Sequence, residues 1–177
     1  MIRVRARAML SSTVLLTAAA CLARFPAPPA TLPEPALDPT RFFSGRTEGQ
    51  GSLKVRLGAD RTLRVQSVGT TQRDGDFRLD QTIQFGNGAV ENRTWLLRRV
   101  NAQHFTATLS DAQGPVRAES NGNLLHLRYR LRRAVYMDQW LYLQADGRSL
   151  ENRAQITVLG IPWARLTETI SPTGGQP

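Results

Sequence analysis

The chain has 177 residues, 41% of them hydrophobic, which is enough for one packed domain with extensions and too many for a disordered chain. Its formal net charge of +9 comes almost entirely from arginine, and the arginines are scattered, so the charge does not indicate a nucleic-acid-binding surface. Cys21 is the only cysteine, which excludes an intramolecular disulfide and a thiolate metal cluster.

The first twenty residues have the layout of a secretory signal. Three arginines open the chain, an uncharged and mostly apolar run follows over residues 8–20, and small residues stand directly before Cys21. The run is shorter than the roughly 20 apolar residues that span a bilayer. We therefore predict a lipoprotein signal peptide over residues 1–20, with Cys21 carrying acyl chains such as palmitate. An ordinary signal-peptidase site is the alternative, because Ala18 stands where a lipobox usually has leucine.

The segment after the signal predicts a tether and a location. Leu22 follows Cys21, and no aspartate is present there to retain a lipoprotein in the inner membrane, so we expect an outer-membrane lipoprotein facing the periplasm. Residues 21–39 are rich in proline, which favours extended polyproline II over helix or sheet. We interpret residues 21–39 as the lipidated cysteine and a semi-rigid tether, 40–171 as the folded domain and 172–177 as a flexible tail.

Period-two alternation runs through the domain, with apolar side chains on one face of each segment and polar side chains on the other. The clearest segments are residues 53–57, 77–85, 104–109 and 125–132. Such alternation is typical of antiparallel strands packed on one side. Turn dipeptides separate the runs at Asp74-Gly75, Asn87-Gly88, Asn121-Gly122 and Asp146-Gly147, and residues 111–114 form a longer loop. About nine or ten strands in succession predict an all-β, antiparallel up-and-down barrel of lipocalin-like (calycin-like) type, with an open sandwich as the alternative.

Sequence motifs for catalysis are absent. His104 and His126 are the only histidines, and each lies on the polar face of an expected strand without the further ligands that zinc requires. No G-x-S-x-G elbow is present, and Gly49 and Gly51 open a strand, where we interpret them as a bend. We therefore expect no enzyme activity, no metal, no cofactor and no nucleic-acid partner, and we expect a monomer.

Two groups of side chains are candidates for binding. The aromatic candidates, which either line a ligand cavity or fill a small barrel, are Phe85, Trp95, Phe105, Tyr129 and Trp140. The basic candidates, which either meet a partner or lipid phosphates or form a solvated strand face, are Arg128, Arg130 and Arg132. The sequence leaves both alternatives open.

Several short pieces of the domain match, in the same order, the sequence pattern of a known family. They are Phe42-Phe43-Ser44-Gly45, residues 79–85, Arg93-Thr94-Trp95, Asn121-Gly122-Asn123 and residues 138–142. On these pieces the chain resembles a bacterial lipoprotein family known only as domain of unknown function 3833, and the resemblance implies no activity. The family pattern often has acids where Gln81 and Gln139 stand, so any acid–base chemistry of those acids would be missing here.

These observations combine into one expected function and one alternative. We expect a periplasmic lipoprotein, held at the membrane by its lipid anchor, that binds or shields a hydrophobic ligand such as a lipid or fatty acid. The alternative is a non-enzymatic structural or interaction module of the cell envelope that uses the arginine-bearing strand face.

Overall fold

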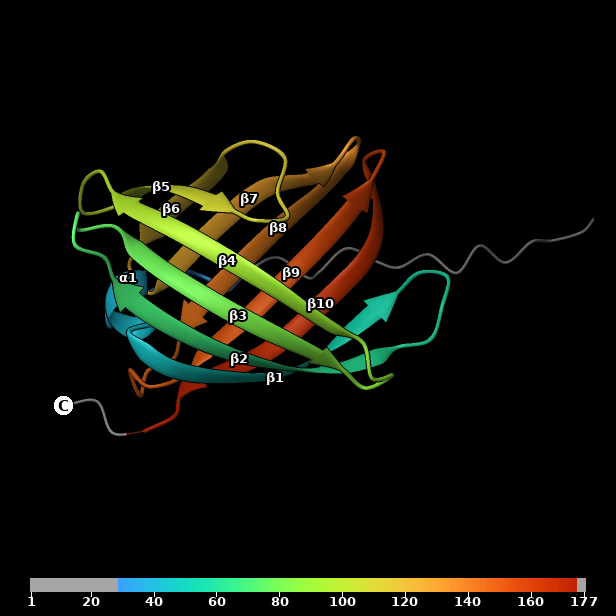
Figure 1. Ribbon diagram of the computed structural model, residues 1–177, viewed down its shortest axis with the longest axis horizontal. Helices are drawn as coiled ribbons and strands as arrows, with labels where there is room; N and C mark the ends of the chain where they lie inside the picture. Colours follow the sequence, from blue (N-terminus) through green and yellow to red (C-terminus); the bar gives the residue numbers. More distant parts are fainter. Residues whose placement is uncertain (1–28, 175–177) are drawn as a thin grey trace, which may run out of the picture.

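The computed structural model describes residues 29–174, and these form one closed antiparallel barrel (Figure 1). In chain order the elements are α1 Pro39–Phe42, β1 Gly45–Val55, β2 Arg61–Thr71, β3 Phe77–Phe85, β4 Val90–Arg99, β5 His104–Leu109, β6 Val116–Asn121, β7 Leu124–Arg132, β8 Val135–Leu143, β9 Leu150–Val158 and β10 Ile161–Pro172. Each strand pairs with the next, and β1 pairs with β10 to close the sheet. The predicted up-and-down barrel of ten strands is confirmed, and the sheet is closed rather than an open sandwich. Within the described residues no helix is long and apolar enough to cross a membrane.

The hairpin turns form where the sequence predicts them. Gly75, in the turn between β2 and β3, has a φ of 86°, and Gly122, between β6 and β7, has a φ of 53°. Glycine adopts this left-handed conformation without the clash that a Cβ would cause, which is why Asp-Gly and Asn-Gly pairs end the strands here. The longer loop over 111–114 joins β5 to β6, also as predicted.

Alternation along the strands produces the core. The burial of β5 follows a strict exposed-buried pattern, and Phe105, Ala107 and Leu109 are its buried residues. Similar inward rows on every strand meet inside the barrel, where Phe77 and Leu150 are 2% and 0% exposed. Burying such side chains, at about 25 cal/mol for each Å² of apolar surface, is the main force that holds the barrel closed.

One end of the barrel is covered by the segment that precedes β1. Asp38 caps the single turn of α1 by accepting a hydrogen bond from the backbone N–H of Thr40 at 3.0 Å. Leu37 is only 4% exposed, and its N–H donates to the carbonyl of Gly122 at 2.8 Å. From Leu32 onward the expected tether therefore packs on the barrel, so the described part of residues 21–39 is not a free stalk.

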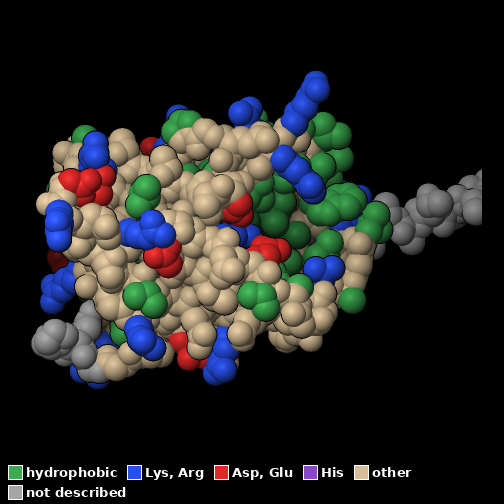
Figure 2. Space-filling model, in the orientation of Figure 1, with side chains coloured by type: hydrophobic (Ala, Val, Ile, Leu, Met, Phe, Trp, Pro, Cys, Tyr) green, Lys and Arg blue, Asp and Glu red, His purple; other side chains and the backbone are tan. Residues whose placement is uncertain are grey.

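The opposite end of the barrel, the mouth, is open. The turns over residues 56–60, 86–89, 133–134 and 159–160 surround it. The β4–β5 ladder runs only from Trp95 to Arg99, so the first residues of β4 form part of the rim. Figure 2 shows this end as a hollow with hydrophobic side chains inside it and basic side chains around it.

Candidate functional site

A cavity of about 130 Å³ lies inside the barrel and opens at the mouth. Apolar side chains from nearly every strand form most of its wall. Those toward the mouth include Leu53, Leu63, Ile83, Phe85, Ile156 and Leu166, and those toward the closed end include Phe43, Phe77, Leu79, Leu141 and Ile170. A concave, mainly apolar space with a few polar groups is the usual form of a small-molecule site.

A belt of polar side chains crosses the inner wall between these two apolar regions. The members of this polar belt are Thr47, Ser67, Gln81, Arg93, Gln139, Asn152 and Glu168. On the β2–β3 wall it separates the small cluster of Leu63, Val65 and Ile83 from the main core. Polar groups at inward positions reduce the stability of a barrel interior, so their concentration at one level marks a candidate site.

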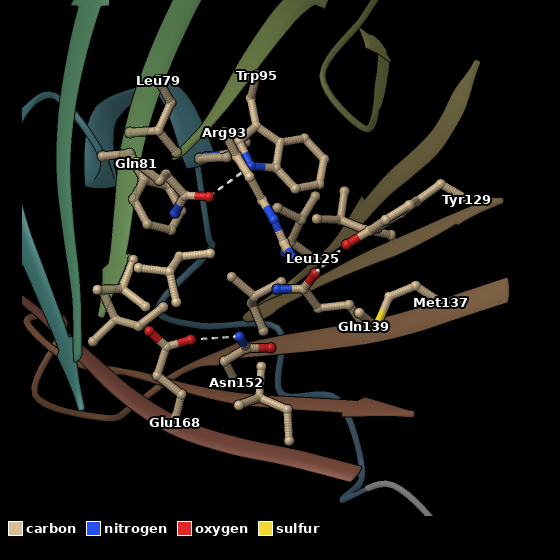
Figure 3. Close-up of a pocket in the computed structure, with 18 of the residues that line it drawn as sticks. Leu79, Gln81, Arg93, Trp95, Leu125, Tyr129, Met137, Gln139, Asn152 and Glu168 are labelled. Atoms are coloured by element: carbon tan, nitrogen blue, oxygen red, sulfur yellow. Dashed lines mark hydrogen bonds between the residues drawn. The ribbon is translucent and has the colours of Figure 1, made fainter. Parts of the chain in front are cut away.

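Four belt residues form a continuous row across adjacent strands. Thr47 pairs with Ser67, Ser67 with Gln81, and Gln81 with Arg93. Gln81 is held at both ends of its amide, since its Nε2 donates to Ser67 Oγ at 3.2 Å and its Oε1 accepts from Trp95 Nε1 at 2.7 Å. This double contact fixes the indole of Trp95 against the cavity (Figure 3).

The facing wall carries the buried acid of the belt. Glu168 is 6% exposed, and its Oε2 accepts a hydrogen bond from Asn152 Nδ2 at 2.8 Å. Burial raises the pKa of Glu168 more than the Asn152 hydrogen bond and the charge of Arg93 lower it. Gln139, on the neighbouring strand, accepts a hydrogen bond from the hydroxyl of Tyr129 at 3.4 Å, and burial likewise raises the pKa of Tyr129.

Arg93 stands where the belt reaches the rim. Its Nε lies 2.9 Å from an Asp111 carboxylate oxygen, and a terminal nitrogen lies 3.1 Å from Glu91. The Arg93 side chain is 21% exposed, whereas those of Asp111 and Glu91 are 38% and 52% exposed. The guanidinium therefore extends toward the cavity while its two partners remain at the surface (Figure 3).

Two glycines of β1 lie where this strand passes close to β10. Gly49 and Gly51 lie within β1 in regular register with both neighbouring strands. A Cβ added at Gly49 would overlap Glu168 Oε1, and one at Gly51 would overlap the carbonyl oxygen of Thr167. The glycines are therefore positions of close approach between β1 and β10.

The predicted aromatic residues fall into three groups. Phe85, Trp95 and Tyr129 line the cavity, and the rings of Trp95 and Tyr129 make an edge-to-face contact at 5.5 Å. Phe105 is buried in the core away from the cavity wall, with the Arg99 guanidinium 4.7 Å from its ring centroid. The expectation for Trp140 is wrong, because alternation along β8 turns it to the outer face, where it stacks on His126 at 5.3 Å.

The arginine candidates lie on the outer face of β7. Arg128 pairs with Arg117 of β6 and lies 3.6 Å from Asp138 of β8. Arg130 follows two residues later on the same exposed side, and Arg132 reaches the β7–β8 turn at the mouth. The three side chains are thus outside the barrel and separate from the cavity.

The belt was missed as a unit at the level of sequence. Its signal is an interruption, because members such as Gln81, Gln139 and Asn152 are polar residues at inward positions of strands whose other inward residues are small or apolar. Gln81, for example, stands between Leu79 and Ile83 in the inward row of β3. Both glutamines where the family resemblance expects acids, Gln81 and Gln139, belong to the belt and face the cavity.

The fold and cavity define a lipocalin-like barrel with an apolar interior. The family described as protein of unknown function DUF3833 matches residues 17–171, and the chain belongs to this family. No curated protein matches the chain by sequence.

Solved structures of other proteins share the barrel. The chain is similar to the S-type phycobiliprotein lyase CPES from Guillardia theta, with 7% identity, a TM-score of 0.62, and coverage of 77% of this chain and 92% of that one. It is also similar to a protein of unknown function from the DUF3598 family of Nostoc punctiforme, with 14% identity, a TM-score of 0.58, and coverage of 78% and 50%. Rv2717c from M. tuberculosis gives 14% identity, a TM-score of 0.57, and coverage of 78% and 99%. These identities establish a common fold and nothing finer.

Proposed function

We propose that this protein is a membrane-tethered periplasmic barrel that binds a hydrophobic ligand, a lipid or a fatty acid. The observation that carries the proposal is an apolar cavity, open at one end, whose wall holds a belt of oriented polar side chains. Apolar walls supply most of the binding free energy, and a few fixed polar groups orient the ligand. The lyase CPES has the same barrel, which supports a ligand-binding interior without specifying the ligand.

The cavity size limits how much of the ligand is enclosed. Its volume of about 130 Å³ is close to that of an engineered cavity of about 150 Å³ that holds one benzene molecule. The enclosed space therefore fits one ring or a short acyl segment. A longer chain would leave its remainder between the turns of the mouth.

The anchor is the part of the proposal that rests on the sequence alone. Cys21 lies outside the described residues, and lipidation there would place the barrel beside a source of lipid ligands. The first described contacts of the tether, made by Leu32 with Asn123, lie at the closed end of the barrel. Incorporation of labelled palmitate into the wild-type chain but not into Cys21→Ser is the expected result. Equal labelling of both proteins would contradict the anchor.

Native mass spectrometry of the purified protein, followed by organic extraction, tests the binding proposal. We expect a stoichiometric adduct that extracts as a lipid. The measurement needs no prior choice of ligand, and it reports the ligand's chemical class. A clean mass that does not shift when fatty acids and phospholipids are added would contradict the proposal.

A second function is favoured by the crowding of arginines on the outer surface of β6 and β7. Arg117 and Arg128 are direct cross-strand neighbours, and like charges so placed destabilise a sheet. The single carboxylate of Asp138, 3.6 Å from Arg128, leaves this pair of cations with a net positive charge that an anionic partner could compensate. The envelope interaction module would use this face. Crosslinks that disappear in Arg128→Glu/Arg130→Glu, and persist when Arg73 in the β2–β3 turn is changed to Glu, would support it. An absence of any crosslinked partner would count against it.

A further inference from the structure

Glu168 is a buried carboxyl group with unused hydrogen-bonding capacity. It is 6% exposed, and Oε2 is occupied by the Asn152 amide. Its Oε1 and the Oδ1 of Asn152 are also buried, and neither has a hydrogen-bond partner among the described residues. Buried polar atoms in native proteins are nearly always paired, so these two oxygens indicate a missing partner.

The space around Glu168 is part of the construction of the barrel. A Cβ at Gly49 would overlap the carboxyl group of Glu168, and a Cβ at Gly51 would crowd the Thr167 carbonyl and the Glu168 Cβ. Glycine in the interior of a strand weakens it, because no side chain is there to pack. Two glycines facing one buried acid therefore favour a specific role for that acid over simple filling of the core.

A neighbouring amide supplies an unused donor. Three polar residues occupy neighbouring inward positions on β8, β9 and β10. Asn152 of β9 pairs directly with Glu168 of β10, and Gln139 of β8 is the diagonal neighbour of Asn152. Gln139 uses its Oε1 for the Tyr129 hydroxyl, while its Nε2 has no partner among the described residues. All three amide or carboxyl groups point into the cavity in Figure 3. An amide donor, an amide acceptor and a carboxyl group, which can both donate and accept when it is uncharged, are thus left together at the level of the belt.

Basic side chains surround the mouth (Figure 2), but the charges at the level of the belt do not favour an anionic ligand. Arg93 is the guanidinium that faces the cavity, and two carboxylates, Asp111 and Glu91, already hold it at 2.9 and 3.1 Å. One cation against two anions leaves this rim group net negative. Burial raises the pKa of Glu168 and so favours its uncharged form. A ligand carboxylate placed between them would lose its hydration without gaining a free cation.

We propose that the polar belt binds an uncharged hydroxyl group of the ligand, so that the cavity selects long-chain alcohols or hydroxylated chains over free carboxylates. The inference rests on the proposed function and names its ligand class. A hydroxyl group donates one hydrogen bond and accepts others, so it can donate to Asn152 Oδ1 and accept from Gln139 Nε2. A carboxylate can only accept, so it leaves Asn152 Oδ1 without a donor and places an ionic charge in a buried site.

Three ligands of equal chain length test the selection. Octane, octanol and octanoate are titrated near neutral pH into the purified full-length protein carrying Trp140→Phe and Trp163→Phe. The remaining tryptophan, Trp95, donates to Gln81 of the belt, so its fluorescence reports on the cavity. We expect octanol to bind about tenfold more tightly than octanoate, which corresponds to the loss of one or two hydrogen bonds.

Substitutions of belt residues test whether the belt causes the preference for octanol. Asn152→Leu should abolish the preference for octanol over octane, whereas Glu168→Gln, which imitates an uncharged carboxyl group, should retain it. Gln66→Leu, on the exposed face of β2 beside Ser67, is the matched control and should change nothing. Circular dichroism of each variant shows whether the barrel is folded, and Glu168→Gln keeps the test valid if Asn152→Leu does not fold.

Two results would overturn this inference, and they differ in what they leave standing. If octanoate binds as tightly as octanol, or if Asn152→Leu keeps the preference, the belt does not read a hydroxyl group, although hydrophobic binding remains. If none of the three compounds binds, the proposed function itself fails.

Discussion

At the scale of single residues, the wall of the barrel is shaped as much by missing side chains as by present ones. Gly49 and Gly51 face inward on β1, and the space that they leave is occupied by the side chain of Glu168. Overpacking a tightly filled interior commonly costs about 1–3 kcal/mol. The steric dependence of these glycine positions on Glu168 can therefore be measured as a coupling energy between substitutions at the two sites.

We predict that Gly49→Ala destabilises the protein by about 1–3 kcal/mol, because the new methyl group would overlap Glu168 Oε1. In a Glu168→Ala background the same change should cost much less, since the overlapping atoms are gone. Chemical denaturation of the four proteins of this double-mutant cycle measures the coupling. Gln50→Ala, which is outward on the same strand, is the control. Additive costs would mean that Gly49 is not required by Glu168.

The raised pKa of Glu168 makes stability depend on pH in a defined direction. A carboxyl group whose folded-state pKa lies above its unfolded value stabilises the fold fully below the unfolded pKa, here 4.5, and this contribution is lost as the pH rises through the folded value. Glu168→Gln removes the titration. We predict that the free energy of unfolding of Glu168→Gln, relative to wild type, increases between acidic and neutral pH. A constant difference across that range would show that Glu168 is not perturbed by burial.

The residue scale is also where prediction from the sequence was least complete. The alternation rule placed Phe85 and Tyr129 on the apolar faces of their strands, whereas Trp95 and Trp140 were selected for their aromatic character. Trp95 lines the cavity, but register turns Trp140 outward onto His126. The belt escaped notice because its members come from different strands, and only the barrel closure brings Glu168 opposite Gln81 and Arg93. Sequence spacing carries no information on such distant pairs until the topology is known.

At the scale of elements, the strands and turns could be predicted from local sequence, whereas the covering of one barrel end by the segment before β1 could not. Hairpin positions were predictable because glycine is needed at specific turn residues such as Gly75. The segment before β1 was expected to be an extended tether on account of its prolines. In the structure Leu37 and Pro39 are buried, and Leu32, although exposed, is held to the barrel by hydrogen bonds with Asn123, so this part of the segment docks on the barrel.

Asn123 is the residue that fastens this segment to the barrel. Its side-chain Oδ1 accepts from the N–H of Leu32 at 2.8 Å, and its Nδ2 donates to the carbonyl of Leu143 at 3.0 Å. We predict that Asn123→Ala destabilises the protein by about 1–3 kcal/mol, because it leaves buried backbone groups unpaired. Hydrogen exchange should show faster exchange at the Leu32 amide. Asn121→Ala, an exposed neighbour at the end of β6, should have little effect on either measurement. Unchanged exchange at Leu32 would mean that packing alone holds the segment.

At the scale of the whole molecule, the segment before β1 covers one end of the barrel, and the cavity opens at the other end, where a ligand can enter from outside (Figure 2). The sequence left open whether the interior is filled or hollow, because aromatic and aliphatic side chains serve either purpose. The answer depends on the summed volumes of the inward side chains on every strand, including two glycines and a belt of medium-sized polar residues. Only the closed three-dimensional arrangement fixes that sum.

Filling the cavity should therefore separate binding from folding. Ile156 lines the wall of β9 toward the mouth and is partly buried, so Ile156→Trp places an indole in the space that the ligand would use. We predict that this variant folds, with a stability change of at most about 1–3 kcal/mol, but yields no lipid adduct and no rise in melting temperature when ligand is added. Val68→Trp, at a position 46% exposed on the outside of β2, should keep both properties. A ligand-dependent rise of equal size in both variants would place the binding site outside the barrel, on the surface rather than in the cavity.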